Sequence, residues 1–213
     1  MEGPGLVESV APRGRTQWIV LAVAVVFLAV AAGYAIRAFA EPDPDELSAV
    51  DRGFLIDMVD HHEQAVEMAI IAQERASNPF VRGFATEVII QQRWELGVME
   101  TVLGRSGYER SFDPDRPAMG WMGMAEVPSS QMPGMATDEE LEELRTASPD
   151  EANVLFLELM TAHHQAGVHM AEYEAEHGSN PYVRQFASDI AGNQASEIGE
   201  YRRLLEQLED PSS

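Results

Sequence analysis

The sequence predicts an all-α protein in which a duplicated helical hairpin forms a four-helix bundle, preceded by one transmembrane helix. Two observations support this prediction. Residues 54–103 recur at 156–205 with a constant offset of 102 and no gap, and each copy is long enough for two helices. A separate apolar run of 19 residues covers 18–36. An internal repeat of this length is stronger evidence for the architecture than any single residue.

The composition limits the classes of function. The chain has 213 residues, enough for one domain and a targeting segment. It has no Cys, which excludes disulfides, zinc thiolate sites and thiol nucleophiles. Its formal net charge is -22, and such an acidic chain repels phosphate backbones. We therefore expect no binding of nucleic acid.

The N-terminal apolar run is close to the ~20 residues that a spanning helix needs. Arg13 and Arg15 precede it, so the N-terminus is expected in the cytoplasm and the body outside the cell membrane. An alternative is cleavage near Ala40, where Ala38-Phe39-Ala40 resembles a signal-peptidase site, and the body would then be secreted or periplasmic. The run is longer than the ~7–15 apolar residues of a typical signal peptide, which favours an uncleaved single-pass signal anchor.

The remaining segments follow from the breaks between the apolar patterns. Ser-Asn-Pro divides each copy, because a polar cap followed by Pro starts a helix. Short loops make the two helices of each hairpin antiparallel neighbours, whereas the long connection between hairpins can cross the bundle, as in ferritin-like folds. The expected segments are a cytoplasmic tail (1–17), the transmembrane anchor or signal segment (18–40), a spacer (41–46), the first helical hairpin (47–104), a linker rich in Met, Gly and Pro with a short helix (105–148), the second helical hairpin (149–208) and a tail (209–213).

Two capping boxes mark helix starts in the second half. Thr137 stands three residues before Glu140, and Ser148 stands three residues before Glu151. In a capping box the hydroxyl and the carboxylate each accept a hydrogen bond from the other residue's backbone N–H. The first box predicts the short helix in the linker, and the second predicts the start of the second hairpin.

A rotation of 100° per residue places one His of each His-His pair on the apolar stripe of its helix, with a Met on either side. The candidate metal ligands are Met58, His61, His62, Met68, Met160, His163, His164 and Met170. On the partner helices the same rotation places polar residues on the apolar stripe, namely Gln91, Glu95, Asn193 and Glu197. A buried Glu is costly without a partner, so we expect these side chains to orient the histidines from a second shell.

Thioethers and imidazoles together favour a soft metal ion. Thioether ligands select Cu(I), and imidazole also suits Cu(II), Zn and Fe. Five methionines of the linker are possible auxiliary ligands: Met119, Met122, Met124, Met132 and Met135. The sequence thus predicts an exported, membrane-anchored protein of the cell envelope that binds copper, with Cu(I) favoured, for buffering, sequestration or delivery. A homo-oligomer or an envelope protein partner stays open.

Two other functions remain open. Methionines at helical spacing also fill cores, so the bundle can be a metal-free interaction module with a structural His/Glu layer. A ferritin-like oxidase needs Glu-x-x-His on two helices, and the one such motif, Glu174 to His177, stands at the end of a helix. We therefore expect no enzymatic activity.

The doubled Met-x-x-His-His pattern with its later Met, the Ser-Asn-Pro helix starts and the Met/Gly linker resemble the domain-of-unknown-function family 305. The resemblance covers residues 47–208. It implies a ferritin-like four-helix bundle that is exported or membrane-anchored. Some members of the family are periplasmic copper-binding proteins linked to copper resistance, which implies the same eight Met and His ligands here. The chain lacks a dense Met/His tail and has His169 where the first copy has Glu67, which argues against high-capacity copper storage.

Overall fold

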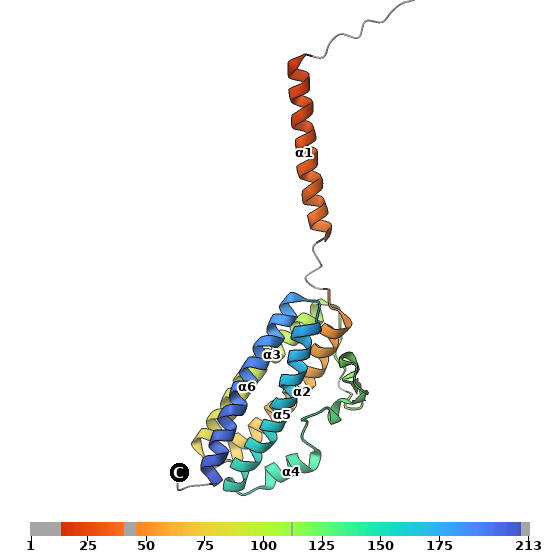
Figure 1. The fold of residues 1–213 in the computed structure, drawn as a ribbon. Helices are drawn as coiled ribbons and strands as arrows, with labels where there is room; N and C mark the ends of the chain where they lie inside the picture. The colour runs from red at the N-terminus through yellow and green to blue at the C-terminus, as the bar shows by residue number, and fades with distance from the viewer. Residues whose placement is uncertain (1–13, 41–45, 112, 210–213) are drawn as a thin grey trace, which may run out of the picture. The chain divides into compact units, whose positions relative to one another are not determined.

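The computed structural model describes residues 14–40, 46–111 and 113–209 (Figure 1). The chain divides into two compact units, Met1–Asp43 and Pro44–Ser213. Most of the expected cytoplasmic tail, residues 41–45 of the spacer and the last four residues lie outside the described residues.

The first unit contains helix α1 (Arg15–Ala40). Its window Gln17–Tyr34 has a mean hydropathy of 2.2, and its apolar side chains are exposed. Length and composition therefore suit a helix that crosses a membrane, and they equally suit a signal sequence at the N-terminus.

The second unit confirms the predicted all-α bundle. Its four long helices are α2 (Ala49–Arg75), α3 (Pro79–Arg105), α5 (Pro149–His177) and α6 (Pro181–Glu209). Helix α2 packs on α3, α5 packs on α6, and the two hairpins meet through α2 and α5 (Figure 1). The short helix α4 (Asp138–Thr146) lies against α2 and α5. The long connection therefore carries the chain from the end of α3 to the start of α5, as a ferritin-like bundle requires.

Local sequence signals set the helix starts. The side chain of Asn78 accepts a hydrogen bond from the Phe80 N–H, and Pro79 is the first residue of α3. The capping boxes that begin at Thr137 and Ser148 are both confirmed. A third capping box joins Ser48 and Asp51 at the start of α2 and does not follow the Ser/Thr-x-x-Glu pattern.

The linker carries two strands that the sequence pattern does not predict. Strands β1 (Pro117–Ala118) and β2 (Val127–Pro128) pair antiparallel, with the 3₁₀ turns η1 (Gly120–Met122) and η2 (Ser129–Gln131) beside them. Asp57 of α2 holds this part of the linker. Its buried carboxylate accepts hydrogen bonds from Arg116 at 2.7 Å and from the Met119 N–H and Trp121 Nε1 at 2.8 Å each.

The bundle core consists of two separate clusters of buried side chains. One, which we call the methionine-rich cluster, includes Met58, Met99, Met119, Met122, Met132 and Met170. The other, which we call the aliphatic cluster, includes Met68, Leu144, Phe156, Leu157, Met160 and Tyr201. Because Met58 clusters with Met170 and Met68 with Met160, helices α2 and α5 run antiparallel and the two repeats have approximate twofold symmetry.

Candidate metal centre

Helices α2 and α5 each place one His at the centre of the bundle. The rings of His61 and His163 stack with centroids 3.6 Å apart and an interplanar angle of 32°, and both residues are fully buried. Among the described residues, no ring nitrogen of either His has a hydrogen-bond partner. Buried polar atoms without partners are rare in folded proteins, so this pair needs an explanation.

Burial keeps both rings neutral. The pKa of His61 is lowered to about 3, mainly by burial and also by the nearby His62 and His164, while the Pro133 backbone opposes the shift. Burial likewise holds the pKa of His163 well below its usual range, with His61 contributing next. A neutral imidazole keeps a lone pair on one nitrogen, which is the form that binds a metal ion.

The second His of each pair contacts a carboxylate on the neighbouring helix. His62 Nε2 lies 2.7 Å from Glu95 Oε2, and Glu95 also accepts a hydrogen bond from Gln91 at 3.0 Å. His164 Nε2 lies 2.7 Å from Glu197 Oε2. The side chain of Glu95 is 3% exposed and that of Glu197 is 21% exposed, so the two contacts differ in their access to water. The structure thus contains the expected His/Glu layer.

One residue of the predicted polar layer faces the other way. The sequence pattern predicts Asn193 on the buried face, and this prediction is wrong because Asn193 is exposed. The neighbouring Gln194 is buried instead and packs over Gly167, where a Cβ atom would clash with the amide. In the first repeat Gln92 is buried in the same way, whereas Gln91 is partly exposed. Gln92 and Gln194 are identical in the two copies, which is the signal that could have identified them.

The predicted methionines fall into two groups. The four helix methionines are buried, with Met58 and Met170 on one side of the histidine layer and Met68 and Met160 on the other. Of the linker residues, Met119, Met122 and Met132 are buried in the methionine-rich cluster and Met135 packs against it, but Met124 is 42% exposed. Met99 of α3 belongs to this cluster too, and no sequence signal marked it. The methionine-rich cluster therefore contains most of the buried methionines.

The linker also covers the paired histidines. Gly134 has φ 80°, and a Cβ there would lie 2.6 Å from Ala166 Cβ and 3.1 Å from His163 Cα. The side chain of Gln64 holds the next residues, because its amide donates to the Ala136 carbonyl at 2.8 Å and accepts from the Ala136 N–H at 2.6 Å. Only Gly allows the linker to approach α5 this closely.

These donors fit a soft metal ion better than a hard one. In residues 14–40, 46–111 and 113–209, no three side chains of His, Asp or Glu converge as a metal-binding group. The available donors are neutral imidazole nitrogens and thioether sulfurs, which suit Cu(I) rather than Mg²⁺, Ca²⁺ or a di-iron pair.

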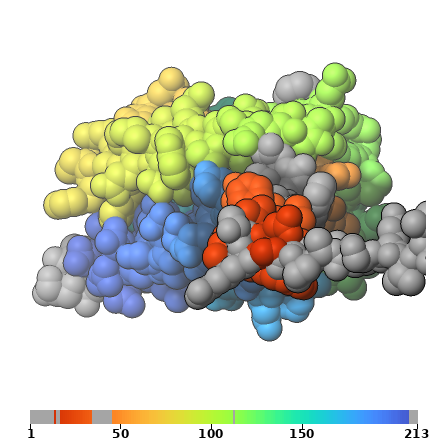
Figure 2. All heavy atoms as spheres, turned by 90° about the horizontal axis from the view of Figure 1, so that it is seen from above, coloured from red at the N-terminus to blue at the C-terminus, as the bar shows by residue number. Residues whose placement is uncertain are grey.

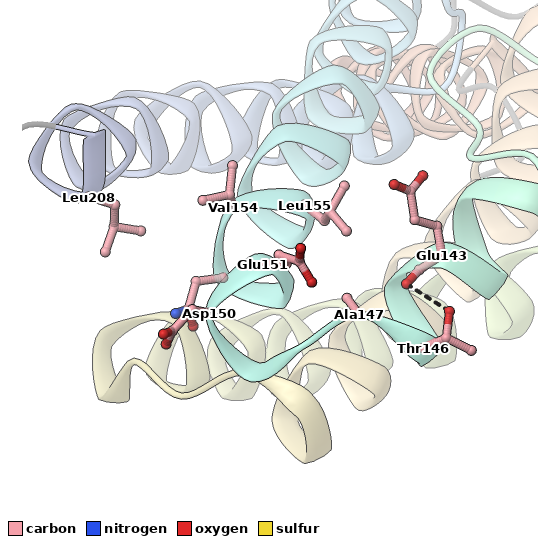
Figure 3. A pocket seen from close by; sticks show the side chains of 9 residues that line it. Glu143, Thr146, Ala147, Asp150, Glu151, Val154, Leu155 and Leu208 are labelled. Carbon is pink, nitrogen blue, oxygen red and sulfur yellow. Dashed lines mark hydrogen bonds between the residues drawn. The ribbon is translucent and has the colours of Figure 1, made fainter.

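A pocket of about 850 Å³ lies elsewhere, between α4, the start of α5 and Leu208 of α6 (Figure 3). Two of its three carboxylates have partners, since Glu151 caps α5 and Asp150 accepts a hydrogen bond from Ser77. Glu151 and His163 are twelve residues apart on one helix, roughly 18 Å. This pocket is not part of the histidine layer.

Comparison with known proteins agrees with this fold. The family model described as "Domain of unknown function (DUF305)" matches residues 51–205. The crystal structure of a putative secreted DUF305 protein from Streptomyces coelicolor has 38% identity and a TM-score of 0.67, over 75% of this chain and 93% of that one. A DUF305 fragment from Deinococcus radiodurans has 28% identity and a TM-score of 0.64, over 76% and 98% of the two chains.

Structures of a protein named CopM are also similar. Its Cu(II)-bound form has 30% identity and a TM-score of 0.56, and its Cu(I)-bound form has 26% identity and a TM-score of 0.54. Each match covers 74% of this chain and 96% of CopM. No curated protein matches this chain.

Proposed function

Since this chain belongs to the DUF305 family, we propose that it is a copper-binding protein that holds Cu(I) at the paired histidines of its bundle. The observation that carries the proposal is the pair His61 and His163, whose four buried ring nitrogens lack hydrogen-bond partners among the described residues. Leaving a buried polar atom unsatisfied costs about 1–3 kcal/mol. Each neutral ring has one nitrogen with a lone pair and one N–H. A metal ion would use the two lone pairs, and a purely structural core would be more stable without the unsatisfied nitrogens.

The methionines support a soft ion. Met58 and Met170 lie on one side of the histidine layer, and Met68 and Met160 lie on the other. An ion bound in this layer would therefore have thioethers on both sides. Glu95 and Glu197 would orient His62 and His164 from the second shell, as carboxylates do for metal-bound imidazoles. Because structures of CopM with Cu(I) and with Cu(II) are similar to this chain, we expect this chain to bind copper as well.

The N-terminal helix supports a place for this activity outside the cytoplasm. We propose that α1 anchors the body to the cell membrane as a single-pass signal anchor, and that copper is buffered, sequestered or delivered in the cell envelope. Cleavage near Ala40 would instead release the same body, and its metal chemistry would not change.

A metal-free bundle is the second candidate, and one observation favours it. Methionines are common core residues, and the contacts of His62 with Glu95 and of His164 with Glu197 can fix the helix register without any ion. In that case the body would serve only as an interaction module.

Replacing His61 and His163 together by Phe separates these functions. Phe keeps two stacked rings and removes the nitrogen lone pairs. We expect the affinity for Cu(I) to fall by at least about a hundredfold. We also expect the melting temperature of the metal-free protein to rise, since the variant no longer buries four unsatisfied polar atoms. Anaerobic titration of the body, residues 44–213, against a colorimetric Cu(I) chelator measures the affinity.

His169→Phe is the matched control, because this His is exposed on the same helix as His163 and should leave Cu(I) binding unchanged. A parallel titration with Zn(II) tests metal identity. An unchanged Cu(I) affinity in the double Phe variant would refute the histidine site, and tighter binding of Zn(II) than of Cu(I) would refute the choice of metal.

A further inference from the structure

A second feature lies on the α3/α6 face, away from the linker. Helices α3 and α6 run along each other there (Figure 2), and between them lies a groove of about 560 Å³. It is lined by Arg93, Trp94, Gly97, Val98, Thr101, Val102, Arg105, Asn180 and Tyr182. The linker and α4 cover the α2/α5 side of the bundle, whereas Trp94 and Tyr182 of this groove remain exposed.

Aromatic side chains form one wall of this groove. Trp94 is 60% exposed and Tyr182 is 56% exposed. Both are held in place by the buried Phe186, which Trp94 meets edge-on at 6.1 Å between centroids and on which Tyr182 stacks at 6.4 Å. Exposed aromatic rings that are already fixed lose little conformational entropy when a partner covers them, which is typical of binding hot spots.

The second repeat shows that the fold does not require these residues. At the positions of α6 that correspond to Arg93, Trp94 and Val98, the chain has Ala195, Ser196 and Glu200. The two helices have the same role in the bundle, but only α3 exposes a Trp flanked by an Arg and apolar side chains. Packing alone therefore does not explain the α3 groove.

The charge of the groove is opposite to that of the protein. Arg93 and Arg105 line it, and its lining residues include no Asp or Glu, although the whole chain has a net charge of -22. A partner that fills the groove thus needs apolar side chains for Trp94 and Tyr182 and a carboxylate for Arg93. Arginine pairs well with carboxylates, because its planar fork can donate two hydrogen bonds.

We propose that this groove binds an acidic amphipathic helix of a partner protein. The stretch of α3 that lines it, from Arg93 to Arg105, is roughly 18 Å long, about three turns of a docked helix. Helices bind such grooves through apolar residues at i, i+3, i+4 and i+7. A membrane surface fits less well, because a flat bilayer cannot fill a concave site and anionic lipids would repel the acidic body.

The test uses the body, residues 44–213, which is a compact unit whose fold solved relatives adopt over 93% and 98% of their own chains. The probe is a fluorescein-labelled 16-residue helical peptide with Leu on one face and Glu on the other, and its twin carries Lys in place of Glu. Fluorescence anisotropy at low salt measures binding. We expect the Glu peptide to bind and the Lys peptide to bind at least about tenfold more weakly.

Two variants and one control locate the site. Trp94→Ser gives α3 the residue that α6 has at the corresponding position. It should weaken binding of the Glu peptide at least about tenfold. Arg93→Glu should reverse the preference between the two peptides. Phe80→Ser is the control, since Phe80 is 69% exposed on the same helix but does not line the groove. Cu(I) binding should not change in any of them.

Four outcomes would overturn the proposal. They are no binding of the Glu peptide, equal binding of both peptides, and binding that Trp94→Ser leaves intact. The fourth is that the groove binds something else. The body would then sediment with phosphatidylglycerol vesicles, or form a dimer in sedimentation equilibrium, and Trp94→Ser would abolish this association. Because the metal titration is separate, failure here leaves the proposed copper site standing.

Discussion

The two repeats of the bundle, α2–α3 and α5–α6, preserve the histidine layer and the methionines on either side of it, and they differ in the residues that contact the linker. His61, His62, Gln92 and Glu95 recur unchanged as His163, His164, Gln194 and Glu197. The residues that hold the linker have diverged, as have Asp51 and Asn153, which contact the ends of the neighbouring hairpin. The shared residues lie where the two hairpins meet, so the layer is the part of the molecule that depends on both copies.

The linker distinguishes the two inner helices. Helix α2 presents Asp57 and Asp60 to Arg116, at 2.7 Å in both ion pairs. The corresponding residues of α5 are Leu159 and Ala162, and neither is acidic. Gly134 approaches α5 at the small side chain of Ala166, where α2 has Gln64. One helix holds the linker by charge, and the other accommodates it by lacking side-chain bulk.

The helix ends differ as well. Asp51 accepts hydrogen bonds at 3.0 Å from the backbone of Ser179 and Asn180 and so caps α6 from the neighbouring hairpin. Asn153, its counterpart, accepts one from the Asn78 N–H at 3.0 Å and caps α3. Only the first end adds a buried acid, Glu174, because the other repeat has Ala72 at that position. The two ends should therefore respond differently to pH.

The largest effect is expected from giving α2 the residue of α5 in Asp57→Leu. This change leaves Arg116 and the Trp121 N–H without their buried acceptor, and breaking a buried ion pair costs about 3–5 kcal/mol. Urea denaturation measures the loss, and limited proteolysis should cut the linker between residues 105 and 136. Asp60→Asn, at a carboxylate 20% exposed, is the milder control. If both variants lose the same stability, Asp57 is not the residue that holds the linker.

A smaller effect is expected from Glu174→Gln. The pKa of Glu174 is raised to about 9, mainly by burial and also by its contact with Asp51. A raised carboxyl pKa means that the folded protein keeps a proton that the unfolded chain loses. This contribution to stability is present below pH 4.5 and is lost as the pH rises toward 9. The variant should match the parent near pH 5 and exceed it by about 2 kcal/mol at pH 8.

Thermal melts between pH 5 and pH 9 measure this difference. Glu172→Gln is the control, because Glu172 is exposed on the same helix and should follow the parent at every pH. A Glu174→Gln curve parallel to the parent curve would show that Glu174 is ionised in the folded protein, and the proposed difference between the two ends would then be wrong.

The repeat made the bundle predictable, because a gapless duplication fixes two hairpins and apolar periodicity fixes their inner faces. The contacts of Glu95 and Glu197 with the histidines followed from the cost of burying a carboxylate. A rotation of 100° per residue cannot separate neighbours at the edge of a stripe, and Asn193 was chosen over Gln194 for that reason. A comparison of the two copies identifies the buried neighbour, since positions 92 and 194 are both Gln whereas positions 91 and 193 are Gln and Asn.

The linker was beyond prediction for a different reason. Its strands are two residues long, and its position depends on hydrogen bonds between Asp57 and residues about 60 positions further along the chain. Such contacts leave no periodicity in the sequence. The same holds for Met99, whose counterpart is Tyr201, so the repeat gave no signal for its place in the methionine-rich cluster.

The smallest effect compares the two His–Glu contacts directly. Glu95→Gln should cost about 1–2 kcal/mol and Glu197→Gln less than about 1 kcal/mol, because water screens the second contact. Glu95 is also bonded to Gln91, whereas the corresponding Asn193 is exposed. Thermal melts rank the two variants against Glu206→Gln, an exposed control on α6. Equal losses of stability in Glu95→Gln and Glu197→Gln would mean that solvent exposure does not weaken the contact between His164 and Glu197. A Cu(I) affinity that falls about tenfold in both variants would show that both carboxylates orient the histidines for the metal.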